Sequence, residues 1–223
     1  MNQSKFCKLL AAVSVTMVLL NTGTVASQEK AENRPKILMP IGDATEVVDT
    51  FYPYFRLQEE GFDVIVAGPA VRLYNLVTHE VPPDAAVPWD ITQEGPGYHL
   101  KADIAFRDVN PEEYAGMFLS GGRAPEYLRY DKDLMRITQY FFKVDKPVAV
   151  VCHGVEIVAA AGVLKGRKMT TVAKCALDIT QVGGQYLDQP MVVDGNMISC
   201  RTWHDYGTPF MKIFIKQLNN IKK

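Results

Sequence analysis

The sequence has 223 residues, with 24 basic and 25 acidic side chains and a formal net charge of −1 at pH 7. Hydrophobic residues make up 48% of it, which is enough for one globular domain with a sizeable core. The near-neutral charge argues against a nucleic-acid partner and against an anionic membrane surface as a partner.

The first residues have the layout of a secretory signal peptide. Lys5 and Lys8 precede an uncharged apolar run at residues 9–20. The small residues 25–27 follow at the positions that a signal peptidase recognises. The apolar run is too short for a membrane-spanning helix. We therefore expect residues 1–27 to be a signal peptide, and an uncleaved anchor is the alternative.

The remaining chain divides into a short linker, residues 28–35, and a single domain, residues 36–221. A signal peptide would make this domain secreted or periplasmic, with no membrane contact after the signal is removed.

Four cysteines occur, and Cys7 lies within the predicted signal peptide. The other three are an odd number, so at least one thiol is free or pairs between chains. No CxxC pair or Cys/His ligand spacing occurs, so we expect no structural zinc, no other metal and no cofactor.

The predicted elements alternate between strands and helices. In chain order they are strand 36–41, helix 47–60, strand 62–67, an irregular proline-rich excursion at 68–97 with a short edge hairpin, strand 100–105, a capped helix start at 110–113, strand 116–119, helix 131–144, strand 147–151, helix 155–161, hairpin 191–199 and helix 208–218. Pro53 predicts a kink or a late start of the first helix. The alternation predicts an α/β fold, a mostly parallel sheet with helices on both faces.

The clearest signal for chemistry is the segment VAVVCHG, residues 148–154, in which a buried strand runs directly into a helix. Such an elbow forces Cys152 into a strained backbone conformation and exposes its side chain. The nearby helix N-terminus favours the thiolate, and His153 and Gly154 supply backbone N–H groups at the same place. A core cysteine that closes a strand is the alternative.

Two further segments are candidates for the same site. In residues 120–126, SGGRAPE, the glycines allow backbone N–H groups to form an oxyanion hole, although an ordinary turn is equally compatible. Arg123 is a candidate for binding a substrate carboxylate, with an exposed ion pair as the alternative. Glu46 lies one turn into the first helix, where an acid is usually solvated. No role is expected for His79, His99 or His204, of which only His204 is a candidate substitute base.

Five segments carry a family resemblance: YPYFRLQEEGF at 52–62, VNPEEY at 109–114, GGRAPE at 121–126, KPVAVVCHG at 146–154 and AGVLKGRK at 161–168. They resemble the DJ/ThiJ/PfpI superfamily, and most closely its PfpI-type, intracellular protease-like branch. The resemblance covers residues 36–218. It implies a flavodoxin-like three-layer sandwich of the class I glutamine amidotransferase type.

The resemblance also implies roles for individual residues. Cys152 would be the nucleophile, and Glu46 the acid that contacts its sulfur. The backbone N–H groups of Gly122 and His153 would form the oxyanion hole. In the PfpI branch a histidine after the nucleophile meets a glutamate of a neighbouring subunit; the matching residues are His153 and Glu126. A homo-oligomer, dimer or larger, is therefore expected.

The chain departs from the family pattern in three places. Ser120 stands where the branch usually has a proline, and Val172 stands where it usually has a tyrosine. The excursion at 68–97 is longer than the usual connection, so it is a candidate for reshaping the pocket rim or the subunit contact.

The leading hypothesis is a cysteine-dependent enzyme that acts on a carbonyl centre of a small carbonyl compound or a peptide. Attack on an amide gives a peptidase or amidase, with His153 as general base and acid. Attack on an aldehyde gives glyoxalase or deglycase chemistry, with Glu46 moving the proton. The alternative is a non-catalytic thiol oxidation sensor or chaperone-like stress protein that uses the same cysteine. A binding domain with a vestigial elbow is a third possibility.

Overall fold

The computed structural model describes residues 34–80, 87 and 93–220. The predicted signal peptide and most of the predicted linker lie outside the described residues. From Pro35 onward the chain forms one compact unit. Within the described ranges, no helix is both long and apolar enough to cross a membrane.

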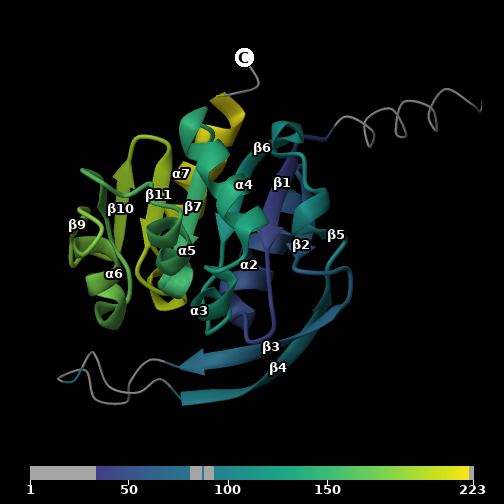
Figure 1. The fold of residues 1–223 in the computed structure, drawn as a ribbon, viewed down its shortest axis with the longest axis horizontal. Helices are drawn as coiled ribbons and strands as arrows, with labels where there is room; N and C mark the ends of the chain where they lie inside the picture. Colours follow the sequence, from purple (N-terminus) through teal and green to yellow (C-terminus); the bar gives the residue numbers. More distant parts are fainter. Residues whose placement is uncertain (1–33, 81–86, 88–92, 221–223) are drawn as a thin grey trace, which may run out of the picture. The chain divides into compact units, whose positions relative to one another are not determined.

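A seven-stranded sheet forms the centre of this unit (Figure 1). Its strands, in spatial order, are β10 (Met191–Asp194), β11 (Met197–Cys200), β7 (Val148–Val151), β6 (Tyr114–Leu119), β1 (Lys36–Pro40), β2 (Asp63–Gly68) and β5 (Ile104–Ala105). All neighbouring pairs are parallel except β10 with β11. The predicted mostly parallel sheet is therefore confirmed.

Helices cover both faces of the sheet, which completes the predicted three-layer, flavodoxin-like sandwich. The helices are α2 (Val47–Glu59), α3 (Pro125–Leu128), α4 (Lys132–Lys143), α5 (Val155–Ala160), α6 (Ala176–Thr180) and α7 (Phe210–Asn220). Side chains of β1 alternate between two buried clusters, as strand geometry requires. Leu38 packs in the cluster that includes α4 and α5. Ile37 and Met39 pack in the cluster that includes α2 and α7.

The irregular segment at 68–97 contains more structure than a short edge hairpin. It forms most of a separate antiparallel ladder, β3 (Leu73–Glu80) with β4 (Gln93–Lys101). The connection between these strands, residues 81–92, lies outside the described residues except for Val87. An isolated bridge from Val77 to Glu46 joins the ladder to the start of α2.

Other boundaries differ for local reasons. The predicted helix start at 110–113 is a single 3₁₀ turn, Pro111–Glu113, because the chain passes directly into β6 at Tyr114. The predicted strand 100–105 is divided between β4 and β5. The sequence did not indicate α3, α6 or the small pair β8 (Lys168–Met169) and β9 (Gln185–Tyr186), all of which are five residues or shorter.

Helix α2 begins at Val47 and continues through Pro53, so it does not start late. Proline has no N–H to donate to the carbonyl oxygen four residues earlier, which here belongs to Asp49. The buried hydroxyl of Ser120 donates to this oxygen instead, at 3.2 Å. The hydrogen bond from the turn after β6 therefore replaces the one that Pro53 removes.

Candidate active site

Cys152 lies at the carboxyl end of β7, on the elbow that the sequence predicted. Its φ is +54°, a conformation that is costly for a residue other than glycine. One 3₁₀ turn, Cys152–Gly154, separates the strand from α5. The Thr171 hydroxyl donates to the Cys152 carbonyl oxygen at 2.7 Å and helps to hold this conformation. The predicted backbone strain is confirmed.

The predicted exposure of the Cys152 side chain is wrong, because only 8% of the residue is exposed. The turn after β6 packs against it so closely that a Cβ on Gly121 would lie 2.5 Å from the Cys152 Cβ. Burial raises the pKa of the thiol well above its usual value, and the nearby Asp49 raises it further. The N–H groups of His153 and Gly122 lower this pKa, but burial outweighs them.

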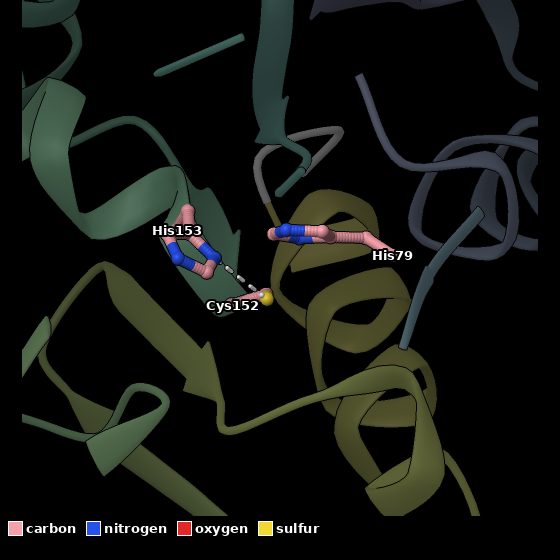
Figure 2. Close-up of side chains that lie close together, drawn as sticks. All are labelled: His79, Cys152 and His153. Carbon is pink, nitrogen blue, oxygen red and sulfur yellow. Dashed lines mark hydrogen bonds between the residues drawn. The ribbon is translucent and has the colours of Figure 1, made fainter. Parts of the chain in front are cut away.

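His153 faces the sulfur although it is the next residue in the chain. Its Nδ1 lies 3.2 Å from the Cys152 Sγ (Figure 2). The ring is buried, and this burial lowers its pKa to about 3. The imidazole is therefore neutral at neutral pH. The strained elbow allows two successive side chains to meet here, which a regular helix start does not.

Glu46 is the N-cap of α2, not a residue one turn into the helix, and its Oε2 accepts the Asp49 N–H at 2.5 Å. Glu46 is 2% exposed and is not the solvated helix-start acid of the alternative interpretation, since the β3–β4 ladder and the turn after β6 lie against it. Its own N–H donates to the Gly121 carbonyl oxygen at 3.1 Å. Burial raises the pKa of Glu46 to about 7, although backbone N–H groups lower it.

Asp49 is a buried acid that the sequence analysis missed. It is 0% exposed, and its Oδ2 has no hydrogen-bond partner among the described residues. Its Oδ1 accepts the Tyr206 hydroxyl at 3.3 Å. Burial and the neighbouring Glu46 raise its pKa. The available signal was spacing, because residues three apart share one face of a helix.

His79, for which no role was expected, reaches the same site from β3. Its ring centroid lies 5.0 Å from that of His153, and Figure 2 shows the ring directed toward Cys152 and His153. One possible ligand atom from each of these three residues lies within 4.8 Å of the others. His153, Glu156 and Cys175 form a second group with the same property. Both groups have donor atoms of the kinds that bind metal ions.

The remaining predicted residues are placed as follows. Gly122 has φ +81°, and its N–H lowers the pKa of the Cys152 thiol; its role in an oxyanion hole stays a prediction. Arg123 forms an ion pair with Glu94 of β4 at 2.6 Å. An exposed ion pair was the alternative to its predicted role in binding a substrate carboxylate. Glu126 is exposed on α3, and its predicted pairing with His153 across subunits stays a prediction.

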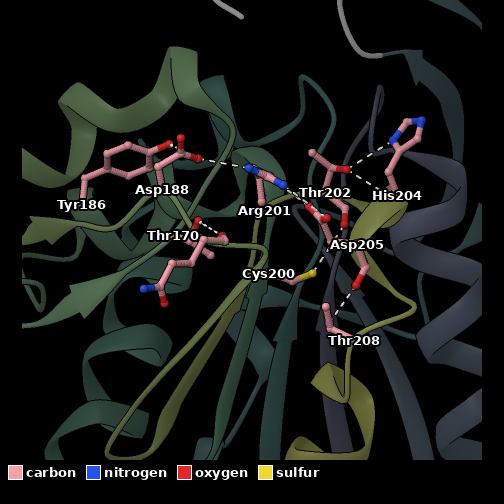
Figure 3. Close-up of polar contacts among 10 residues, drawn as sticks. Thr170, Tyr186, Asp188, Cys200, Arg201, Thr202, His204, Asp205 and Thr208 are labelled. Atoms are coloured by element: carbon pink, nitrogen blue, oxygen red, sulfur yellow. Dashed lines mark hydrogen bonds and ion pairs between the residues drawn. The ribbon is translucent and has the colours of Figure 1, made fainter. Parts of the chain in front are cut away.

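Cys200 and His204 belong to a different polar network, shown in Figure 3. The Cys200 Sγ donates to the Thr202 carbonyl oxygen at 3.4 Å. The His204 ring stacks on Trp203 and contacts the Thr202 hydroxyl. Cys152, Cys175 and Cys200 are all free thiols.

Comparison with known proteins supports the resemblance. The chain is 37% identical over 183 residues to a protein named deglycase PfpI from Pyrococcus furiosus, covering 82% of this chain and 99% of that one. A protein named deglycase from Pyrococcus horikoshii is also 37% identical, with the same coverage. A solved ThiJ/PfpI domain protein from Brachyspira murdochii shares the fold, with a TM-score of 0.68 at 18% identity over 84% of this chain and 97% of that chain. Residues 35–217 match the model of the DJ-1/PfpI family, and the chain belongs to that family.

Proposed function

We propose that this protein is a cysteine-dependent enzyme that acts on aldehyde groups of small or glycated compounds, with Cys152 as nucleophile. The observation that carries the proposal is the strained elbow, which holds the Cys152 sulfur against the His153 Nδ1 and the Gly122 N–H. The names of the Pyrococcus relatives, both called deglycase, support the same reaction class.

The two acid–base groups favour aldehyde chemistry over amide hydrolysis. A proton-transfer group works best when its pKa lies near the operating pH. Glu46, with a pKa raised to about 7, meets this condition. His153, with a pKa lowered to about 3, is a weak base for activating a thiol and is seldom protonated for a leaving amine.

The proposed reaction begins with attack of the Cys152 sulfur on the aldehyde carbon. The S–H bond breaks and its proton passes to the aldehyde oxygen, which gives a hemithioacetal. The N–H groups of Gly122 and His153 then donate to the oxygen that gains charge. For a 2-oxoaldehyde such as methylglyoxal, Glu46 removes the proton from the former aldehyde carbon and delivers it to the adjacent carbon. Water cleaves the resulting thioester, so that methylglyoxal and water become lactate and the thiol is restored.

The test is turnover of methylglyoxal by the purified protein and three variants. Cys152→Ala should abolish turnover, and Glu46→Gln should reduce kcat by roughly a hundred- to ten-thousand-fold, the usual worth of one proton-transfer group. Cys200→Ala, which removes a second buried free thiol on the strand beside β7, is the control and should keep its activity. Full activity of Cys152→Ala would overturn the proposal.

A second comparison separates the two carbonyl reactions. His153→Ala should damage any amide hydrolysis more than it damages aldehyde turnover, since only the amide route needs the ring to protonate a leaving amine. If Glu46→Gln kept full aldehyde activity, the peptidase reaction or a non-catalytic role of the thiol would be preferred.

A further inference from the structure

We propose that His79, Cys152 and His153 form a binding site for one borderline divalent cation of the Zn²⁺ type, with a fourth position open to water. Two imidazole nitrogens and one thiolate sulfur are the donor set that Zn²⁺ and Co²⁺ accept readily and that Mg²⁺ and Ca²⁺ do not.

The distances suit a small metal ion. Two ligands bonded to Zn²⁺ at about 2.0 and 2.3 Å in a tetrahedron lie roughly 3.5 Å apart. The His153 Nδ1 and the Cys152 Sγ are already 3.2 Å apart. The His79 ring completes the group within 4.8 Å, so closure onto an ion needs a movement of about 1 Å. Figure 2 shows the His79 ring approaching from the opposite side to His153.

The charged and polar groups around the three ligands also bear on a bound cation. Asp49 Oδ2, buried and without a hydrogen-bond partner among the described residues, lies on the Cys152 side and adds an acceptor oxygen near the site. The positive charge of Lys174 acts on both histidines, and it therefore disfavours binding of a cation.

The neighbouring group of His153, Glu156 and Cys175 is less suited to an ion. The Glu156 carboxylate is engaged by the Arg129 guanidinium at 3.0 Å, and the same guanidinium contacts Asp178 at 2.9 Å. A divalent cation there would lie beside a fixed positive charge. His79, near the end of β3, belongs to the proposed site and not to this second group.

Binding must release one proton. The reaction joins the metal ion to the sulfur, breaks the S–H bond and releases H⁺ to solvent, while the two neutral rings bind without losing a proton. Affinity should therefore rise with pH. If Cys152 is the nucleophile, the bound ion withdraws it from reaction, and this consequence alone depends on the proposed function.

The test is titration of the chelator-stripped, reduced protein with Co²⁺, whose bond to a thiolate gives a charge-transfer absorption, followed by displacement with Zn²⁺. The wild type should bind one Co²⁺ per chain with this absorption, and Mg²⁺ should not displace it. Cys152→Ala should lose the absorption. His79→Ala should bind at least about tenfold more weakly, since even the removal of an outer partner of a ligand typically costs that much.

His99→Ala is the matched control, because His99 is an exposed histidine on the other strand of the same ladder, and it should bind as the wild type does. Absorption that survives in Cys152→Ala but disappears in Cys175→Ala would place the ion in the second group and overturn the proposal. Unchanged affinity in His79→Ala would also overturn it. The absorption does not depend on turnover, so an inactive protein that still binds Co²⁺ would refute the proposed function and not the metal site.

Discussion

At the scale of single residues, the site is an assembly of buried polar groups that oppose one another's ionisation. Glu46 and Asp49 lie three residues apart and both are buried, and the Glu46 charge makes it harder for Asp49 to lose its proton. Burial and the nearby Asp49 raise the pKa of the Cys152 thiol. Such clusters cost folding free energy, and they are common at functional sites because shifted pKa values serve the chemistry there.

Glu46→Gln should change how stability depends on pH. The ordinary pKa of 4.5 applies in the unfolded chain, whereas burial raises the folded value to about 7. Between these values the unfolded chain has lost this proton and the folded protein keeps it, so the wild type loses stability as pH rises through this range. Relative to Glu46→Gln, the loss should be on the order of 1–3 kcal/mol. Urea unfolding at pH 4.5 and pH 8 measures it; a difference independent of pH would contradict the buried-acid assignment.

Ser120→Ala should destabilise the protein by about 1–2 kcal/mol, because it leaves the buried Asp49 carbonyl oxygen without a donor. In a Pro53→Ala background the new N–H can supply that hydrogen bond, so the same substitution should then cost less. A double-mutant cycle of unfolding free energies measures this coupling. Strictly additive effects would show that Ser120 does not replace the hydrogen bond missing at Pro53.

At the scale of elements, the β3–β4 ladder converts an ordinary elbow into a covered site. It bridges to Glu46 at the start of α2 and carries His79 to within contact of His153. Gly97 of β4 allows this close approach, since a Cβ there would meet the Val47 side chain at 2.3 Å and the Leu76 carbonyl oxygen at 2.8 Å.

Gly97→Ala should move the ladder away from α2 and uncover Cys152. The expected results are a loss of about 1–3 kcal/mol in unfolding free energy, typical of overpacking, and faster alkylation of Cys152. Gly95→Ala is the matched control on the same strand, because its Cβ would meet only the movable Thr78 hydroxyl. Equal alkylation rates in the two variants would show that the ladder does not cover the thiol.

At the scale of the whole molecule, two predictions concern what lies around the described unit. Helix α3 carries the exposed Glu126, and the neighbouring Tyr130 is 81% exposed. Purified protein should sediment as a dimer or larger, and Tyr130→Glu should shift it toward the monomer. A fully active monomer would remove the proposed role of Glu126.

The second prediction concerns export. Protein recovered from the secreted or periplasmic fraction should begin at or near Gln28, because the small residues before it match a signal-peptidase site. N-terminal sequencing of that fraction is the measurement, and recovery of Met1 would contradict it.

The sequence by itself determined most strands and helices of the central α/β unit, its mostly parallel sheet and the strained elbow at Cys152. These follow from local hydrophobic patterns and from one abrupt change from strand to helix periodicity. The tertiary structure decided the burial of Cys152, the lowered pKa of His153 and the positions of Asp49 near Cys152 and of His79 near His153. These depend on which distant segments cover the elbow, and the ladder that brings His79 begins almost 80 residues before Cys152 in the chain. Burial, which sets the pKa of each group, is a property of that packing and not of any local pattern.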